Sequence, residues 1–140
     1  MNTPRRLLHP ILLTLCAALL FGGCASTQNP QSRNDIASLK TAHLAFIDEF
    51  TEGPGKTWDD QRLAARKAAL ESQFAATEQE AAKTKDANRN KAVANLHSRF
   101  KKHVATLERQ KAFFRPTYAA DLKTALSKNY DMALKGEDIR

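Results

Sequence analysis

The sequence predicts an all-α protein, an elongated helical hairpin or small bundle of three to four helices that follows a flexible N-terminal tether. Apolar residues recur at helical spacing through most of residues 34–140. The 140 residues include only five Gly and five Pro, too few for the many turns of an all-β fold. Residues 24–140 hold 21 Ala but only 20 Leu, Ile, Val and Phe, which indicates thin helices around a modest core.

The first predicted helix carries an apolar stripe formed by Ile36, Leu39, His43, Ile47 and Phe50. Asn34 or Asp35 is expected to cap its N-terminus, because short polar side chains accept hydrogen bonds from the first free backbone N–H groups. Residues 51–56 (TEGPGK) are expected to end this helix, because Gly and Pro are costly inside a helix.

A second helix is predicted from Thr57, which stands three residues before Asp60 in an imperfect capping box. No large apolar residue lies between Phe74 and Val93, so residues 57–115 form either one long helix or a hairpin. We favour the hairpin, with a turn near Asp86–Asn90, because Asp and Asn are typical of turns and caps.

The third and fourth predicted helices meet at Pro116, which lacks the backbone donor that a helix interior needs. The apolar stripe before it is formed by Val93, Leu96, Phe100, Val104, Leu107 and Phe114. The stripe after it is formed by Tyr118, Leu122, Leu126, Tyr130 and Leu134. Gly136 is expected to end the last helix, since Gly is the common residue just beyond a helix C-terminus.

The first 23 residues have the pattern of an export signal. Arg5 and Arg6 form a positively charged start, and residues 11–21 form an apolar run that is too short to span a bilayer. Such a segment is removed from the mature protein, so we expect it to take no part in the fold.

The sequence Leu20-Phe21-Gly22-Gly23-Cys24 resembles the lipobox of bacterial lipoproteins, with Phe21 at a position where Leu is usual. The resemblance implies cleavage before Cys24, a lipid on the Cys24 thiol and acylation, as with palmitate, of the new amino group. Several acyl chains on one residue give stable membrane anchoring. The alternative is an ordinary secretory signal cleaved after Ala25, which would release a soluble protein.

The same resemblance sets the domain organisation and the location. Residues 1–23 are the expected signal peptide, residues 24–33 the lipidated Cys24 with a flexible tether, and residues 34–140 the helical domain. Ala25 and Ser26 follow the cysteine, where an Asp would imply retention at the inner membrane. We therefore expect the protein in the outer membrane of the cell, held by the lipid on Cys24 and facing the periplasm.

Charge is unevenly distributed along the chain. Residues 83–115 carry ten basic and two acidic residues, whereas residues 24–82 carry six basic and nine acidic ones. The basic segment either packs against the acidic first half and is neutralised, or binds an anionic partner such as lipid headgroups, lipopolysaccharide phosphates or an acidic protein. The candidate residues for such binding are Lys91, Arg99, Lys101 and Lys102. Nucleic acid is not expected, because of the predicted location and the lack of a basic–aromatic motif.

No motif predicts an enzyme, a cofactor or a metal site. His43 is expected at the edge of the core, and His97 and His103 are six residues apart, so they do not share a helix face. No His or Cys cluster has ligand spacing, and no nucleophile elbow is present. We expect a non-enzymatic, lipid-anchored periplasmic protein with a structural or interaction role at the cell envelope. The alternative is a chaperone-like or lipid-handling module for anionic or amphipathic clients.

Overall fold

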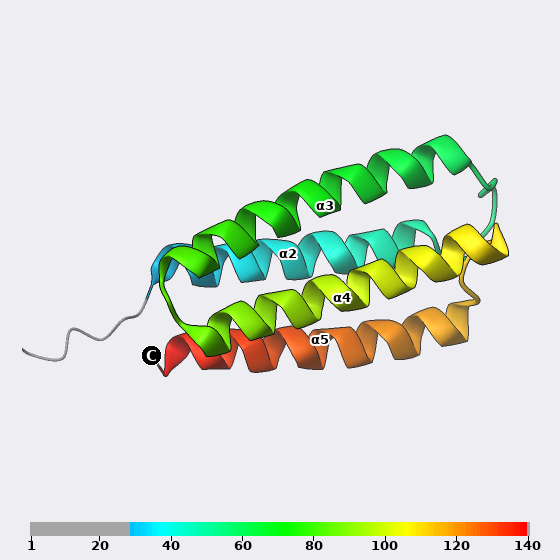
Figure 1. The fold of residues 1–140 in the computed structure, drawn as a ribbon. Helices are drawn as coiled ribbons and strands as arrows, with labels where there is room; N and C mark the ends of the chain where they lie inside the picture. Colours follow the sequence, from blue (N-terminus) through cyan, green and yellow to red (C-terminus); the bar gives the residue numbers. More distant parts are fainter. Residues whose placement is uncertain (1–28, 140) are drawn as a thin grey trace, which may run out of the picture.

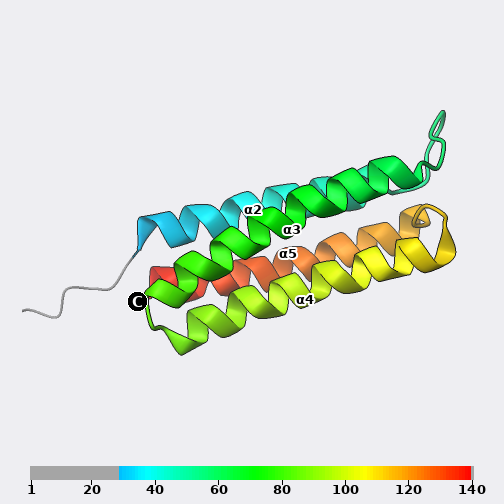
Figure 2. The same cartoon turned by 45° about the horizontal axis from the view of Figure 1, so that its top comes forward.

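The computed structural model describes residues 29–139, which form a four-helix bundle (Figure 1). The helices are α2 (Pro30–Glu49), α3 (Asp60–Lys83), α4 (Ala87–Gln110) and α5 (Pro116–Asp138). Each helix runs antiparallel to the next along the chain (Figures 1 and 2). Helices α2 and α4 each pack against both α3 and α5, so α2 and α4 lie diagonally across the bundle. The predicted all-α class is confirmed.

The bundle has two distinct ends. At the end that we call the terminal end, the start of α2, the turn 84–86 and the end of α5 lie together (Figure 1). At the opposite end, the loop end, the segment 50–59 lies beside the segment 111–115. These two loops are joined by two backbone hydrogen bonds, from Phe114 N–H to Phe50 C=O at 2.8 Å and from Glu52 N–H to Phe114 C=O at 2.9 Å.

The core follows the apolar stripes read from the sequence. Ile36, Leu39 and Ile47 of α2 are fully buried, as are Val93, Phe100 and Leu107 of α4. Aromatic rings fill the middle of the bundle, where Phe74 and Phe100 stack with centroids 5.5 Å apart. Burying apolar area of this kind is the main stabilising contribution in a bundle whose exposed faces are polar.

The connection between the second and third predicted helices is a tight turn, so the hairpin is confirmed over the single long helix. Helix α3 ends at Lys83, and Lys85 in the turn adopts a left-handed backbone with φ 57°. Asp86 then caps α4 by accepting hydrogen bonds from the N–H groups of Asn88 and Arg89 at 2.9 and 3.0 Å. Pro116 also breaks the chain as predicted and is the first residue of α5.

Three predicted helix boundaries were wrong. Helix α2 begins at Pro30, because Asn29 rather than Asn34 or Asp35 caps it. Residues 30–33 are therefore helix and not tether. Residues 1–28, which include the predicted signal, Cys24 and most of the predicted tether, lie outside the described residues.

The other two corrections concern α3 and α5. The cap of α3 is Asp59 and not Thr57, since the Asp59 carboxylate accepts from Gln61 N–H at 2.8 Å. Helix α5 continues through Gly136 to Asp138, because its last turn is held by side-chain contacts to neighbouring helices.

Candidate functional site

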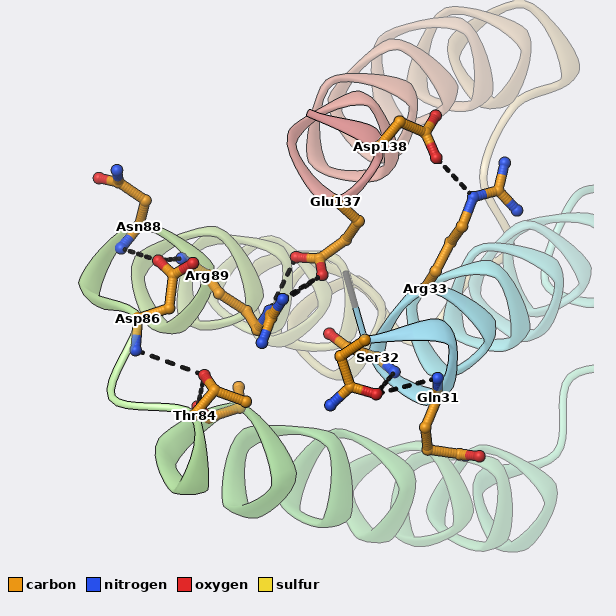
Figure 3. A network of polar contacts seen from close by, with 11 residues as sticks. Gln31, Ser32, Arg33, Thr84, Asp86, Asn88, Arg89, Glu137 and Asp138 are labelled. Atoms are coloured by element: carbon orange, nitrogen blue, oxygen red, sulfur yellow. Dashed lines mark hydrogen bonds and ion pairs between the residues drawn. The ribbon is translucent and has the colours of Figure 1, made fainter. Parts of the chain in front are cut away.

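A buried ion pair joins α4 to α5 at the terminal end (Figure 3). The Arg89 guanidinium donates from Nε to both carboxylate oxygens of Glu137, at 3.0 and 2.9 Å, and its Nη2 lies 2.7 Å from Oε2. The two side chains are only 2% and 1% exposed. A charge buried this deeply is tolerated only with a partner of opposite sign, so each residue depends on the other.

Each of these charges lies at the helix end that disfavours it. Arg89 is in the first turn of α4, where the helix dipole is positive, and Glu137 is in the last turn of α5, where it is negative. Their direct pairing offsets both penalties. Arg89 is one of the ten basic residues of segment 83–115, but Glu137 already neutralises its charge inside the protein, so Arg89 is not available to an anionic partner.

A row of three polar side chains crosses the centre of the bundle. His43 Nδ1 lies 3.2 Å from the Tyr130 hydroxyl, and His43 Nε2 lies 3.1 Å from His103 Nδ1. His43 is fully buried at the junction of α2, α4 and α5, so the prediction that it lies at the edge of the core was wrong. The planes of the Phe74 and Phe100 rings lie nearly perpendicular to the His43 ring.

These contacts fit two neutral imidazole rings. Each neutral ring has one N–H donor and one acceptor nitrogen. The two hydrogen bonds of the row can therefore both point toward His103 or both point toward Tyr130. Burial, aided by the nearby His103, lowers the pKa of His43 to about 3. Burial, followed by the charge of Arg99, also lowers the pKa of His103. Burial raises the pKa of Tyr130, so its hydroxyl stays protonated and remains a donor.

A second histidine site lies between α4 and α3. His97 Nε2 is 2.6 Å from Glu71 Oε2, His97 Nδ1 is 2.9 Å from Glu78 Oε1, and the ring stacks on Phe74 with centroids 4.7 Å apart. An imidazolium can donate to both carboxylates, whereas a neutral ring can donate to only one. This arrangement fastens the α3–α4 hairpin. In the part of the chain that the structure describes, no group of three or more His, Cys, Asp or Glu is placed to hold a metal ion.

The four basic residues predicted to bind an anionic partner are all exposed, but they do not share one stripe. Successive residues of a helix turn by roughly 100°, which places Lys91 and Lys102 on the outward line of α4, opposite its buried side. Arg99 lies on the flank beside α5, where it borders a shallow cleft, and Lys101 lies on the flank that faces α3. Arg109, which sequence reasoning did not single out, extends the line of Lys91 and Lys102.

The basic segment is only partly neutralised. Three of its ten cations form ion pairs, namely Lys83 with Glu80, Arg89 with Glu137 and Lys111 with Asp60. Among residues 29–139, no carboxylate lies within ion-pair distance of the other seven, all of which are exposed. Two of the three pairs involve the acidic first half, so the expected neutralisation by that half is slight.

Comparisons with known proteins give no further guide, since the chain matches no protein-family model, no curated protein and no solved structure.

Proposed function

We propose that the chain is a lipid-anchored periplasmic protein with a structural or interaction role at the bacterial cell envelope. In this proposal Cys24 carries the lipid that holds the protein at the outer membrane, and the bundle presents its surface to partners. The sequence Leu20-Phe21-Gly22-Gly23-Cys24, placed shortly before a folded bundle, is the observation that carries the proposal.

The start of α2 limits how far the bundle can stand from the membrane. Only residues 25–29 separate Cys24 from Pro30, and five fully extended residues span at most about 18 Å. A bundle anchored in this way stays close to the membrane surface. No helix within residues 29–139 combines the length and the apolar character needed to cross a bilayer.

The exposed cations support an interaction role. Lys91, Arg99, Lys101 and Lys102 lack ion-pair partners among the described residues, and they surround α4 on its outward face and both flanks. Such a surface attracts anionic lipids, lipopolysaccharide phosphates or acidic proteins by long-range electrostatics. Neutralising all four residues is expected to weaken binding to anionic vesicles or to an acidic partner, and unchanged binding would remove this surface from the proposal.

Replacing Cys24 by serine tests the anchor. The wild-type protein is expected to float with the membrane fraction in a density gradient, and Cys24→Ser is expected to be lost from it. Retention in the membrane fraction of a Cys24→Ser protein from which the signal has been removed would contradict lipid anchoring. Circular dichroism of both proteins is the control, because Cys24 precedes the bundle and its replacement is expected to leave helicity unchanged.

The second candidate is a chaperone-like or lipid-handling module for anionic or amphipathic clients. It is favoured by an open cleft of about 760 Å³ at the loop end, which combines aromatic rings with two arginines. Binding of an unfolded outer-membrane protein or of lipid in vitro is expected for such a module and not for a purely structural protein.

A further inference from the structure

The cleft at the loop end has features that the core and the ion pairs do not account for. It lies between the end of α4 and the start of α5, with Arg109 and Arg115 among its lining residues. Phe113 and Tyr118 supply aromatic surface, and Tyr118 is 47% exposed although it is a large ring. Exposed large aromatic side chains beside charged groups are typical of binding surfaces.

The two arginines of this cleft are available to a ligand. Both are exposed, and within residues 29–139 neither guanidinium forms an ion pair, although Glu52 also lines the cleft. Two guanidinium groups against one carboxylate leave the cleft with net positive charge. The planar guanidinium has donors arranged to bind a carboxylate with two parallel hydrogen bonds, so the complementary ligand is a carboxylate.

The aromatic wall is fixed in place by the rest of the loop end. The Phe113 ring meets Trp58 edge to face at 5.6 Å, and the Arg62 guanidinium lies 6.0 Å from the Phe113 centroid. Tyr118 packs on the buried Phe114 with centroids 5.7 Å apart. These contacts hold the rings in place before a ligand arrives, which lowers the entropy lost on binding.

We propose that this cleft binds an acidic segment of a partner protein, with aspartate or glutamate carboxylates on Arg109 and Arg115 and an apolar side chain against Phe113 and Tyr118. Arginine, tyrosine and phenylalanine are enriched in protein–protein interfaces, which favours a protein over a lipid headgroup as the ligand of this cleft. The inference rests on the proposed function only for the source of the partner, an envelope protein.

The position of the cleft agrees with such a partner. It lies at the loop end, whereas the lipid of the proposed function precedes α2 at the terminal end (Figure 1). The 23 residues of α5 separate the two ends by about 34 Å. A cleft this far from the anchored end is presented to proteins of the periplasm.

The test uses the mature protein as the cell makes it and a fluorescein-labelled peptide that repeats Glu-Phe-Asp-Leu. A matched peptide that repeats Gln-Phe-Asn-Leu has the same apolar residues without the charge. Binding is followed by fluorescence anisotropy and by the emission of Trp58, the only tryptophan, which touches the cleft wall through Phe113. We expect the acidic peptide to bind and to change Trp58 emission, and the amide peptide to bind far more weakly.

Variants locate the binding. Arg109→Gln with Arg115→Gln is expected to weaken binding about tenfold. Tyr118→Ala is expected to weaken it several-fold and Tyr118→Phe only slightly, because the ring and not the hydroxyl makes the contact. The matched control is Lys128→Gln with Lys135→Gln, which removes the same charge from exposed positions of α5 more than a Debye length away and is expected to have about a twofold effect or less.

Three results would overturn the inference. They are failure of the acidic peptide to bind wild-type protein, an equal loss in the α5 control, and binding to phosphatidylglycerol vesicles, through Arg109 and Arg115, in place of the peptide. A failure of the proposed function would be seen separately. If the mature protein carries no lipid, the peptide experiment still reports on the cleft, because its lining residues all lie within the bundle.

Discussion

Replacing Glu137 by glutamine removes the carboxylate that neutralises Arg89 in the interior of the bundle. The Glu137 and Arg89 side chains are 1% and 2% exposed, so water cannot solvate the Arg89 charge that is left without its partner. Breaking a buried pair from one side costs about 3–5 kcal/mol, because the remaining charge stays buried and unpaired. At about 4 °C per kcal/mol for a domain of this size, the thermal midpoint is expected to fall by roughly 10–20 °C.

The assay is thermal unfolding followed by circular dichroism, with urea unfolding to give the free energy. Asp138→Asn is the matched control, because it breaks the exposed Arg33–Asp138 pair in the same turn of α5 and is expected to cost at most about 1 kcal/mol. The double replacement Arg89→Met with Glu137→Met is expected to recover most of the stability, since it removes both charges. If Glu137→Gln costs no more than Asp138→Asn, the pair is not buried in solution and the reasoning is refuted.

The other predictions concern pH, capping and charge. A histidine whose pKa is lower in the folded state than in the unfolded state takes up a proton on unfolding. Its contribution to the free energy of unfolding is therefore complete above about pH 6.5 and is lost as the pH falls toward 3. Because the pKa of His43 is about 3, urea unfolding at pH 5 should give a free energy of unfolding about 2 kcal/mol lower than at pH 7. His43→Leu should flatten this pH dependence. The same slope of stability against pH in the variant would contradict the assignment to His43. Asp86→Ala should cost about 1 kcal/mol in the same assay by removing the cap of α4, and a neutral effect would show that the cap is dispensable. Lys91→Gln with Lys102→Gln should reduce binding to anionic vesicles in co-sedimentation, and equal binding would exclude the outward line of α4 as the contact surface.

The helices and their order were predictable from sequence because they depend on local patterns. The spacing of Val93, Phe100 and Leu107 placed one apolar face on α4, and Gly53 and Pro54 marked a break that no helix crosses cheaply. The start of α2 was missed because residues 25–35 hold no large apolar residue, although Asn29 before Pro30 was a capping signal that could have been read.

The polar contacts were not predictable because they join residues far apart in the chain. Arg89 and Glu137 are 48 positions apart in the sequence. They form a pair only because the end of α5 packs against the start of α4 in the fold. His43 and His103 are 60 positions apart, and their contact depends on the diagonal placement of α2 and α4. Helical spacing predicts that Lys91 and Lys102 are exposed. The cleft beside Arg109 could not be predicted in this way, because residues of separate segments form it at the loop end.

The intact mass of the mature protein from the membrane fraction tests lipid anchoring most directly. We expect a mass equal to residues Cys24–Arg140 plus a diacylglyceryl group and one amide-linked acyl chain. An unmodified chain that begins at Ser26 would contradict it, because the protein would then be free in the periplasm and only its exposed charges and clefts would determine where it binds.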